Sequence, residues 1–203
     1  MLFTDGSDFL QDALQKMRNI IQSIHPLSED EWLYFSSLWI PFSAERKQLI
    51  SREEEKEKYL YFVTEGVQRI YYYDEQGKEA TILFTYPPSF GGILDSLLLQ
   101  QLSKFRYEAV TSSAFLRAPF QELQHAMERY PAINHIIRLG VTAALSGVLE
   151  RLVELQCFSA EERYKKLLKR SPHILNLVPQ KYLANYLGMD PSNFSKLVNK
   201  VRI

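Results

Sequence analysis

Short polar and cationic side chains dominate the C-terminal end of the sequence, where no acidic residue follows Asp190. Hydroxyl, carboxamide and ammonium groups of this size can hydrogen-bond to the edges of nucleic-acid bases or neutralise backbone phosphates. The residues that could do this chemistry are Lys181, Ser192, Asn193, Ser195, Lys196, Asn199, Lys200 and Arg202.

Two short helices joined by a tight turn are predicted to position these side chains. Apolar residues recur at helical spacings on both sides of Gly188, whose permissive backbone suits the turn. Asp190 can cap the second helix by accepting a hydrogen bond from its free amide groups, and Pro191 suits the first helical position. This layout is typical of a helix-turn-helix that reads DNA.

The first residues of a recognition helix point into the major groove, so we expect base contacts from Ser192, Asn193 and Lys196. Lys200 and Arg202 are expected to meet phosphate. The alternative that these residues leave open is an ordinary helical hairpin with a basic exposed face.

Charge is segregated along the chain. The sequence contains 24 basic and 24 acidic residues, but residues 160–203 hold nine of the basic residues and only three of the acidic ones. A basic end on an acidic body indicates a polyanionic partner for that end alone.

Composition argues against several other classes. At 203 residues, the chain can bury one substantial core and a small second one, and it has no apolar run that could span a membrane. We expect a cytoplasmic protein without membrane contact. Its single cysteine, Cys157, is expected to be a buried thiol and excludes a cysteine-ligated iron–sulfur cluster within one chain. No catalytic or metal-binding motif stands out, and the acidic run Glu53–Glu57 is interpreted as a solvated turn, so we expect no enzyme.

The remaining chain divides into helical, β and helical parts. An amphipathic helix is predicted over residues 7–25, and a capping box at Ser28–Glu31 predicts a second helix. Aromatic and β-branched residues from Gln48 to Pro119 predict short antiparallel strands in a sandwich or barrel. The predicted strands are 59–63, 67–73, 80–86 and 107–111.

A long helix is predicted from Pro131 to about Cys157. Five of its apolar residues follow steps of 4, 3, 4 and 3, which is the spacing of a coiled-coil seam. The predicted dimer seam consists of Val141, Leu145, Val148, Leu152 and Leu155. Because two heptads are too few to hold a dimer alone, the alternative is that some of these residues pack on the β-barrel. A second capping box, Ser159–Glu162, starts the basic segment.

The order of these parts resembles the cyclic-AMP receptor and Fnr family of bacterial transcription regulators. The resemblance is carried by residues 59–66, 71–80, 89–92 and 181–200. It implies an α+β fold with a jelly-roll-like, cyclic-nucleotide-binding-like effector domain over residues 1–130. It further implies a dimerisation helix over residues 131–158 and a DNA-binding helix-turn-helix domain over residues 159–203.

The family's ligand pocket is where this sequence departs. In members that bind cyclic AMP, a glutamate takes the ribose and an arginine takes the phosphate. Here the glutamate position holds Gly92, and the arginine position falls near Ser103 in a loop that is one residue longer. Lys104 or Arg106 could supply a substitute charge for another anionic effector. The candidate ligand residues are Phe90, Gly91, Gly92, Ile93, Leu94, Ser103, Lys104 and Arg106.

The resemblance implies a homodimer that binds a palindromic operator in double-stranded DNA and contacts RNA polymerase. We expect that cyclic AMP is not used in the usual way. Either an unknown small molecule serves as effector or the barrel is a scaffold without one. The family's C-terminal wing is expected to be missing because the sequence stops at Ile203. The competing hypothesis is a ligand-sensing or protein-interaction module that does not bind DNA and has a truncated C-terminal domain.

Overall fold

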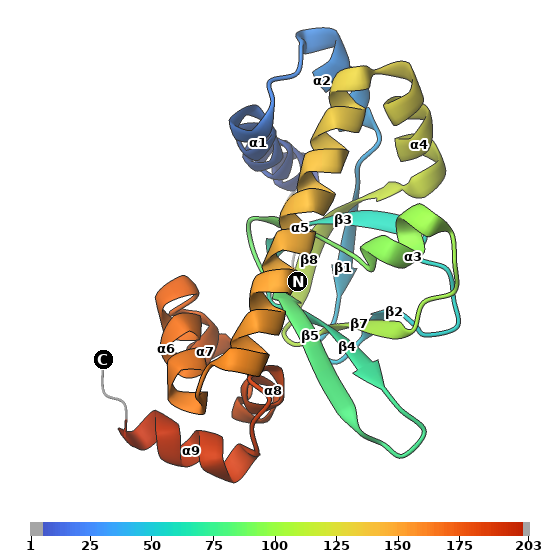
Figure 1. The fold of residues 1–203 in the computed structure, drawn as a ribbon. Helices are drawn as coiled ribbons and strands as arrows, with labels where there is room; N and C mark the ends of the chain where they lie inside the picture. The colour runs from blue at the N-terminus through green and yellow to red at the C-terminus, as the bar shows by residue number, and fades with distance from the viewer. Residues whose placement is uncertain (1–5, 201–203) are drawn as a thin grey trace.

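Two helices lead into the structure, a computed structural model that describes residues 6–200 (Figure 1). The first helix, α1 (Gly6–Ile24), buries Ala13, Met17 and Ile21 at steps of four residues. The second helix, α2 (Glu29–Ser37), begins at the predicted capping box. There the Glu31 amide donates to the Ser28 hydroxyl, and the Ser28 amide donates to the Glu31 carboxylate over 2.8 Å. Both predicted helices are confirmed.

Eight strands follow and form two four-stranded antiparallel sheets. The order in the first sheet is β1-β8-β3-β6 and in the second β2-β7-β4-β5. Their bounds are β1 Ile40–Ala44, β2 Leu49–Ser51, β3 Tyr59–Glu65, β4 Gln68–Tyr73, β5 Glu79–Thr85, β6 Ser89–Gly91, β7 Phe105–Ala109 and β8 Ser113–Pro119. The sheets face each other in a jelly-roll-like sandwich, here called the β-roll, and they do not close into a barrel.

The four predicted strands correspond to β3, β4, β5 and β7. The predicted start of the β region at Gln48 was wrong, because β1 already begins at Ile40. Its Pro41 lowers strand propensity, and β2 and β6 have only three residues each, too few for a clear pattern. These strands are recognisable only by their pairing with strands that lie far away in sequence, as β1 pairs with β8.

Aromatic rings fill the interior of the β-roll. Tyr61 lies at its centre, with ring centroids 5.7 Å from those of both Tyr107 and Phe115. Ile93 and Val63 pack in the same cluster, and all five side chains are almost completely buried. These side chains occupy the part of the β-roll interior that a bound ligand would otherwise fill.

A carboxylate, Glu57, is buried beside these rings, with only 4% of the residue exposed. Its oxygens accept hydrogen bonds from the Ser51 hydroxyl at 2.5 Å and from the backbone amides of Lys58 and Tyr59 at 2.9 and 3.2 Å. Burial raises the pKa of Glu57 above its ordinary value of 4.5, although these hydrogen bonds oppose the shift. The prediction that Glu53–Glu57 forms a solvated turn was thus wrong at its last residue. A short acidic run does not reveal which of its members the β-roll will enclose.

Helices cover one side of the β-roll and extend beyond it. They are α3 (Leu94–Leu99), α4 (Phe120–Arg129) and the long α5 (Pro131–Cys157), whose predicted bounds are confirmed. Near its start, α5 buries Ile133 and Ile136 in a core shared with α1, α2 and α4. Cys157, at the other end of the helix, is exposed, so the prediction of a buried thiol was wrong.

The C-terminal helices are α6 (Ala160–Arg170), α7 (Ile174–Leu177), α8 (Gln180–Tyr186) and α9 (Pro191–Lys200). The second predicted capping box is confirmed at Ser159 and Glu162, directly before α6. These helices share a core with the β-roll, because Val67 and Val110 belong to the same buried cluster as Tyr164, Leu183 and Phe194. The C-terminal helices therefore pack directly on the sandwich, in addition to being joined to it through α5.

The buried Glu57 predicts a specific dependence of stability on pH. Since its pKa is raised in the folded protein, this group contributes most favourably below its unfolded pKa, and the contribution is lost as pH rises through the folded pKa. We expect the free energy of unfolding of the wild type, relative to Glu57→Gln, to fall as pH rises from about 4.5 towards neutrality. Urea unfolding of both proteins across this range measures the difference, and parallel pH profiles would contradict the expectation.

Candidate nucleic-acid interface

The start of α9 is fixed by the cap that the sequence predicts. The Asp190 carboxylate accepts the backbone amide of Ser192 at 2.8 Å and the Ser192 hydroxyl at 2.6 Å. Because these hydrogen bonds favour its charged form, the pKa of Asp190 lies below its ordinary value. Gly188 occupies the turn with φ +62°, and a Cβ atom there would lie 3.0 Å from the Leu155 side chain. The direction of α9 is therefore set locally by a cap and a left-handed glycine.

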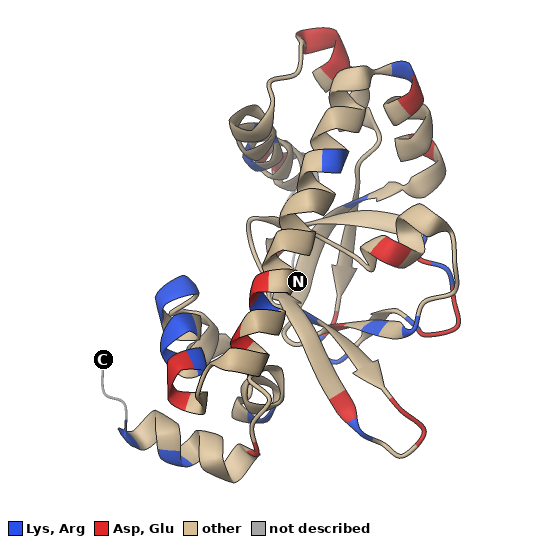
Figure 2. Ribbon diagram, viewed as in Figure 1, with Lys and Arg blue, Asp and Glu red and all other residues tan. Residues whose placement is uncertain are grey.

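The polar residues of α9 are exposed along the helix. Figure 2 shows that α9 carries basic residues and no acidic residue beyond its start. Among the described residues, no carboxylate lies within ion-pair distance of Lys196, whereas the Lys200 ammonium lies 3.5 Å from Glu161 on α6. Arg202 lies outside the described residues. The exposed members of the predicted set are Lys181, Ser192, Asn193, Ser195, Lys196, Asn199 and Lys200.

The basic run on α6 is tied back to the protein by acidic residues. Glu154 on α5 is 3% exposed, and its carboxylate lies 3.7 Å from Arg151, 3.8 Å from Lys166 and 3.6 Å from Arg170. Lys165 pairs with Glu161 one turn away at 2.7 Å. The positive charge of α6 is thus partly compensated by Glu154 and Glu161.

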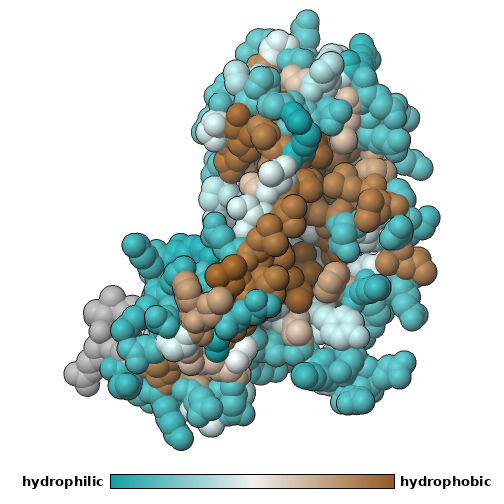
Figure 3. All heavy atoms as spheres, viewed as in Figure 1, coloured by the Kyte–Doolittle hydropathy of each residue, from teal (hydrophilic) through white to brown (hydrophobic). Residues whose placement is uncertain are grey.

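The predicted seam of α5 forms an exposed apolar stripe (Figure 3). Leu145 is 56% exposed, Val148 42%, Leu152 48% and Leu155 41%, while Val141 is partly buried at the upper end. The opposite side of the same helix buries Arg151 and Glu154. The alternative that the seam packs on the β-roll is therefore wrong for these four residues.

The predicted ligand residues do not converge on one site. Gly91, Gly92 and Ile93 border the β-roll interior, where a Cβ atom on Gly91 would lie 2.6 Å from the Tyr107 hydroxyl. Ser103 is buried, and its hydroxyl bonds to the backbone of Phe105 at 2.8 and 2.9 Å.

The two predicted cationic substitutes point elsewhere. Lys104 is exposed to solvent. Arg106 forms a two-pronged ion pair with Glu53, one bond being 2.6 Å, and stacks 4.4 Å from the Tyr73 ring. The charge of Arg106 is therefore already balanced by its own chain.

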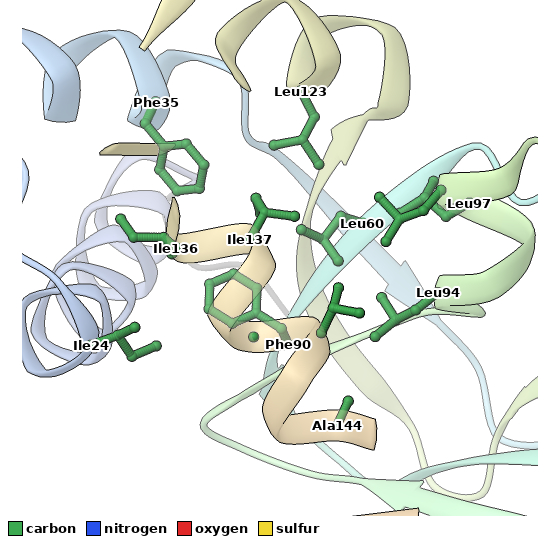
Figure 4. A pocket seen from close by; sticks show the side chains of 13 residues that line it. Ile24, Phe35, Leu60, Phe90, Leu94, Leu97, Leu123, Ile136, Ile137 and Ala144 are labelled. Atoms are coloured by element: carbon green, nitrogen blue, oxygen red, sulfur yellow. The ribbon is translucent and has the colours of Figure 1, made fainter. Parts of the chain in front are cut away.

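Phe90 and Leu94 face a different space, an apolar pocket of about 110 Å³ between the β-roll and helices α1, α3 and α5 (Figure 4). Gly140 and Ala144 leave room on the α5 side. Its walls are hydrocarbon, so nothing in it would hold the charge of a nucleotide. The lining residues are Ile24, Phe35, Leu60, Phe90, Leu94, Leu97, Leu98, Leu123, Ile136, Ile137, Gly140, Val141 and Ala144.

Sequence reasoning missed the residues that join the C-terminal helices to the β-roll. Asn185 on α8 hydrogen-bonds to β5, and Arg69 on β4 lies against the ring of Tyr182 on α8. The only signal in the sequence was an arginine, Arg69, within a strand rich in aromatic residues. Its role becomes clear only when its partners Glu79, Glu108 and Tyr182 are known from the structure.

No helix within residues 6–200 has the length and apolar character needed to cross a membrane. A search of curated protein sequences found no match.

Solved structures with the same architecture are numerous, although their sequences are distant. FixK2 from Bradyrhizobium japonicum superposes with a TM-score of 0.74 and 17% identity over 80% of this chain and 83% of that one. A putative transcriptional regulator of the Crp/Fnr family from Eubacterium rectale gives 0.69 and 15% identity, over 86% and 83%. The c-di-GMP responsive global regulator CLP from Xanthomonas campestris gives 0.65 and 14%, over 85% and 91%.

At the level of sequence families, residues 41–130 match the cyclic nucleotide-binding domain. This range runs from the second residue of β1 to just past the end of α4 and contains the β-roll except for Ile40. These residues are thus similar to a cyclic nucleotide-binding domain, and the chain as a whole has the fold seen in the solved Crp/Fnr-type regulators.

Proposed function

We propose that the protein is a dimeric, DNA-binding transcription regulator of the Crp/Fnr type that does not use cyclic AMP in the usual way. The observation that carries the proposal is the polar and cationic face of α9, which starts at a rigid cap and has no acidic group after Asp190. The positive end of the helix and its short side chains suit entry into a major groove.

Individual roles follow from the contacts of each residue. Ser192 is engaged by Asp190 and serves chiefly to hold the cap. Asn193 and Lys196 remain free to reach base edges. Lys200 can exchange its 3.5 Å contact with Glu161 for a DNA phosphate, because an exposed ion pair of this length is weak.

Dimerisation through α5 is supported by the apolar stripe. Four seam side chains between 41% and 56% exposed would be covered if two α5 helices packed about a two-fold axis. Such a dimer presents two α9 helices to successive major grooves, so the operator is expected to be palindromic.

Cyclic AMP is disfavoured by charge and by space. A cyclic phosphate inside the β-roll would meet the buried Glu57 carboxylate and the rings of Tyr61 and Tyr107. The Arg117 guanidinium is already stacked on the rings of Phe42 and Tyr59, 4.3 and 4.4 Å from their centres. A structurally similar regulator, CLP, is described as responsive to c-di-GMP, so the fold accommodates different signals. The present chain is proposed to bind DNA without a nucleotide.

The recognition face is tested by enrichment of genomic DNA fragments with the purified protein, without added ligand. Wild type is expected to recover a two-fold symmetric motif. Lys196→Ala/Lys200→Ala should bind that motif about ten- to a hundredfold more weakly, because a base contact and a phosphate contact are lost, and its affinity should fall less steeply with salt. The matched control, Lys56→Ala/Lys78→Ala, removes two exposed lysines from the β-roll and should leave binding unchanged. Equal loss in both variants would place the DNA contact outside α9, whereas no motif with wild type would favour a module that does not bind DNA.

The seam is tested by placing a charge on it. Leu152→Glu should weaken dimerisation by at least about tenfold, since an unpaired carboxylate would be buried between the helices. Sedimentation equilibrium measures the change. Leu33→Glu is the control, because Leu33 on α2 is 63% exposed and lies away from the stripe. An unchanged dimer in Leu152→Glu would place the interface elsewhere.

Nucleotide dependence is tested by isothermal titration of the protein with cyclic AMP. We expect no heat of binding and no change in affinity for the enriched motif, because Glu57 and the aromatic rings occupy the β-roll interior. Saturable binding of cyclic AMP to wild type would overturn this part of the proposal if that binding were lost in Gly91→Leu, where the added side chain would fill space inside the β-roll.

A further inference from the structure

Helix α8, which precedes the recognition helix, has two occupied faces. Leu183, Ala184 and Leu187 are buried in the core of the C-terminal helices. Tyr182, Asn185 and Tyr186 lie at the three- and four-residue spacings of the other face, and each of these side chains contacts a residue outside the C-terminal helices. This second face is not needed to fold a helix-turn-helix, so its contacts call for another explanation.

Asn185 completes the open edge of a sheet. Strand β5 is the outermost strand of its sheet, which leaves a row of backbone groups without a neighbouring strand. The Asn185 carboxamide donates to the Glu79 carbonyl at 2.7 Å and accepts from the Thr81 amide at 2.6 Å. One side chain thereby makes the pair of hydrogen bonds that a neighbouring peptide group would make. These bonds hold α8 beside the edge of β5 (Figure 1).

Tyr182 closes over a buried cation. The Arg69 guanidinium lies 3.8 Å from the Tyr182 ring centre and 3.9 Å from that of Tyr71. It pairs with Glu79 at 2.7 Å and with Glu108 at 3.0 Å, while only 2% of the arginine side chain is exposed. A cation stacked on aromatic rings in this way links α8 to three strands of one sheet.

Tyr186 lies between the β-roll and the long helix. Its ring centre is 5.2 Å from that of Phe84 on β5 and 4.0 Å from the Arg151 guanidinium on α5. This face of α8 therefore contacts both the sheet, through Phe84 on β5, and the long helix α5, through Arg151.

We propose that Asn185, Tyr182 and Tyr186 are positioning residues that dock α8 on the β4–β5 hairpin and so set the angle of α9 relative to α5. The inference rests on the proposed DNA-binding function. Docking leaves the polar face of α9 exposed, so it presents the recognition helix and does not mask it. In a dimer, the angle between α9 and α5 determines the spacing of half-sites that both helices can reach at once.

The test compares wild type with Asn185→Leu and Tyr182→Leu, which remove the docking groups and retain apolar bulk. Gln180→Leu is the matched control, because Gln180 lies on α8 but is exposed and makes no side-chain hydrogen bond among the described residues. Two readouts are measured on full-length protein: hydrogen exchange of the Thr81 amide, and affinity for palindromic duplexes whose half-site spacing is varied one base pair at a time.

Thr81 should be protected from exchange in wild type and in Gln180→Leu, and should exchange faster in Asn185→Leu. Both docking variants should bind the preferred spacing about tenfold more weakly and discriminate less between spacings, because fewer molecules hold α9 at the required angle. Unchanged spacing preference in a folded Asn185→Leu protein would overturn the positioning role. Failure of wild type to bind any duplex would overturn the proposed function and the positioning role together. Exchange at the Thr81 amide is measured without DNA, so it reports whether α8 is docked even if the protein binds no duplex.

Discussion

A buried guanidinium holds together the region where the β-roll meets the C-terminal helices. Arg69 has almost no access to water, and a charge in that position is costly unless it is paired and hydrogen-bonded. Glu79 and Glu108 provide the pairing from the two strands beside β4, and Tyr182 covers the guanidinium from α8. Because the guanidinium is bonded from the strands on both sides of β4 and covered by a ring from α8, the strand pairing, the ion network and the placement of α8 depend on each other. The C-terminal helices consequently form one packed body with the sandwich.

The long helix α5 shows how one element can serve two purposes. Its buried side anchors the lead-in helices at one end through Ile133 and carries the Arg151–Glu154 pair at the other. Its exposed side is a continuous apolar stripe that water does not favour. The stripe and the polar face of α9 lie on the same connected set of helices, α5 to α9. In the proposed dimer, the packing of two α5 helices would therefore also fix the relative placement of the two α9 helices.

The β-roll has the fold of a cyclic nucleotide-binding domain, and aromatic side chains pack its interior. Tyr61 and Tyr107 occupy the centre, and burial raises the pKa of both hydroxyls, so they stay neutral. Glu57 adds a carboxylate whose hydrogen bonds are supplied by its own chain. An apolar pocket of about 110 Å³ lies beside α5, outside this aromatic cluster. Fold and ligand chemistry are separable properties, as is general for widely used folds.

Local patterns in the sequence determined the two lead-in helices, the long α5, both capping boxes and the turn at Gly188, because each depends on neighbours within a few residues. Whether the seam of α5 is exposed was decided only by the tertiary structure. Four of the eight strands were also legible from alternating and aromatic residues. The sequence could not say which charges would be available. The pairing of Arg106 with Glu53, the burial of Glu57 and the bond from Thr81 to Asn185, 104 residues away, arise only when distant segments meet. Secondary structure is largely a short-range property, whereas the electrostatic state of a side chain is set by whatever the tertiary fold places beside it.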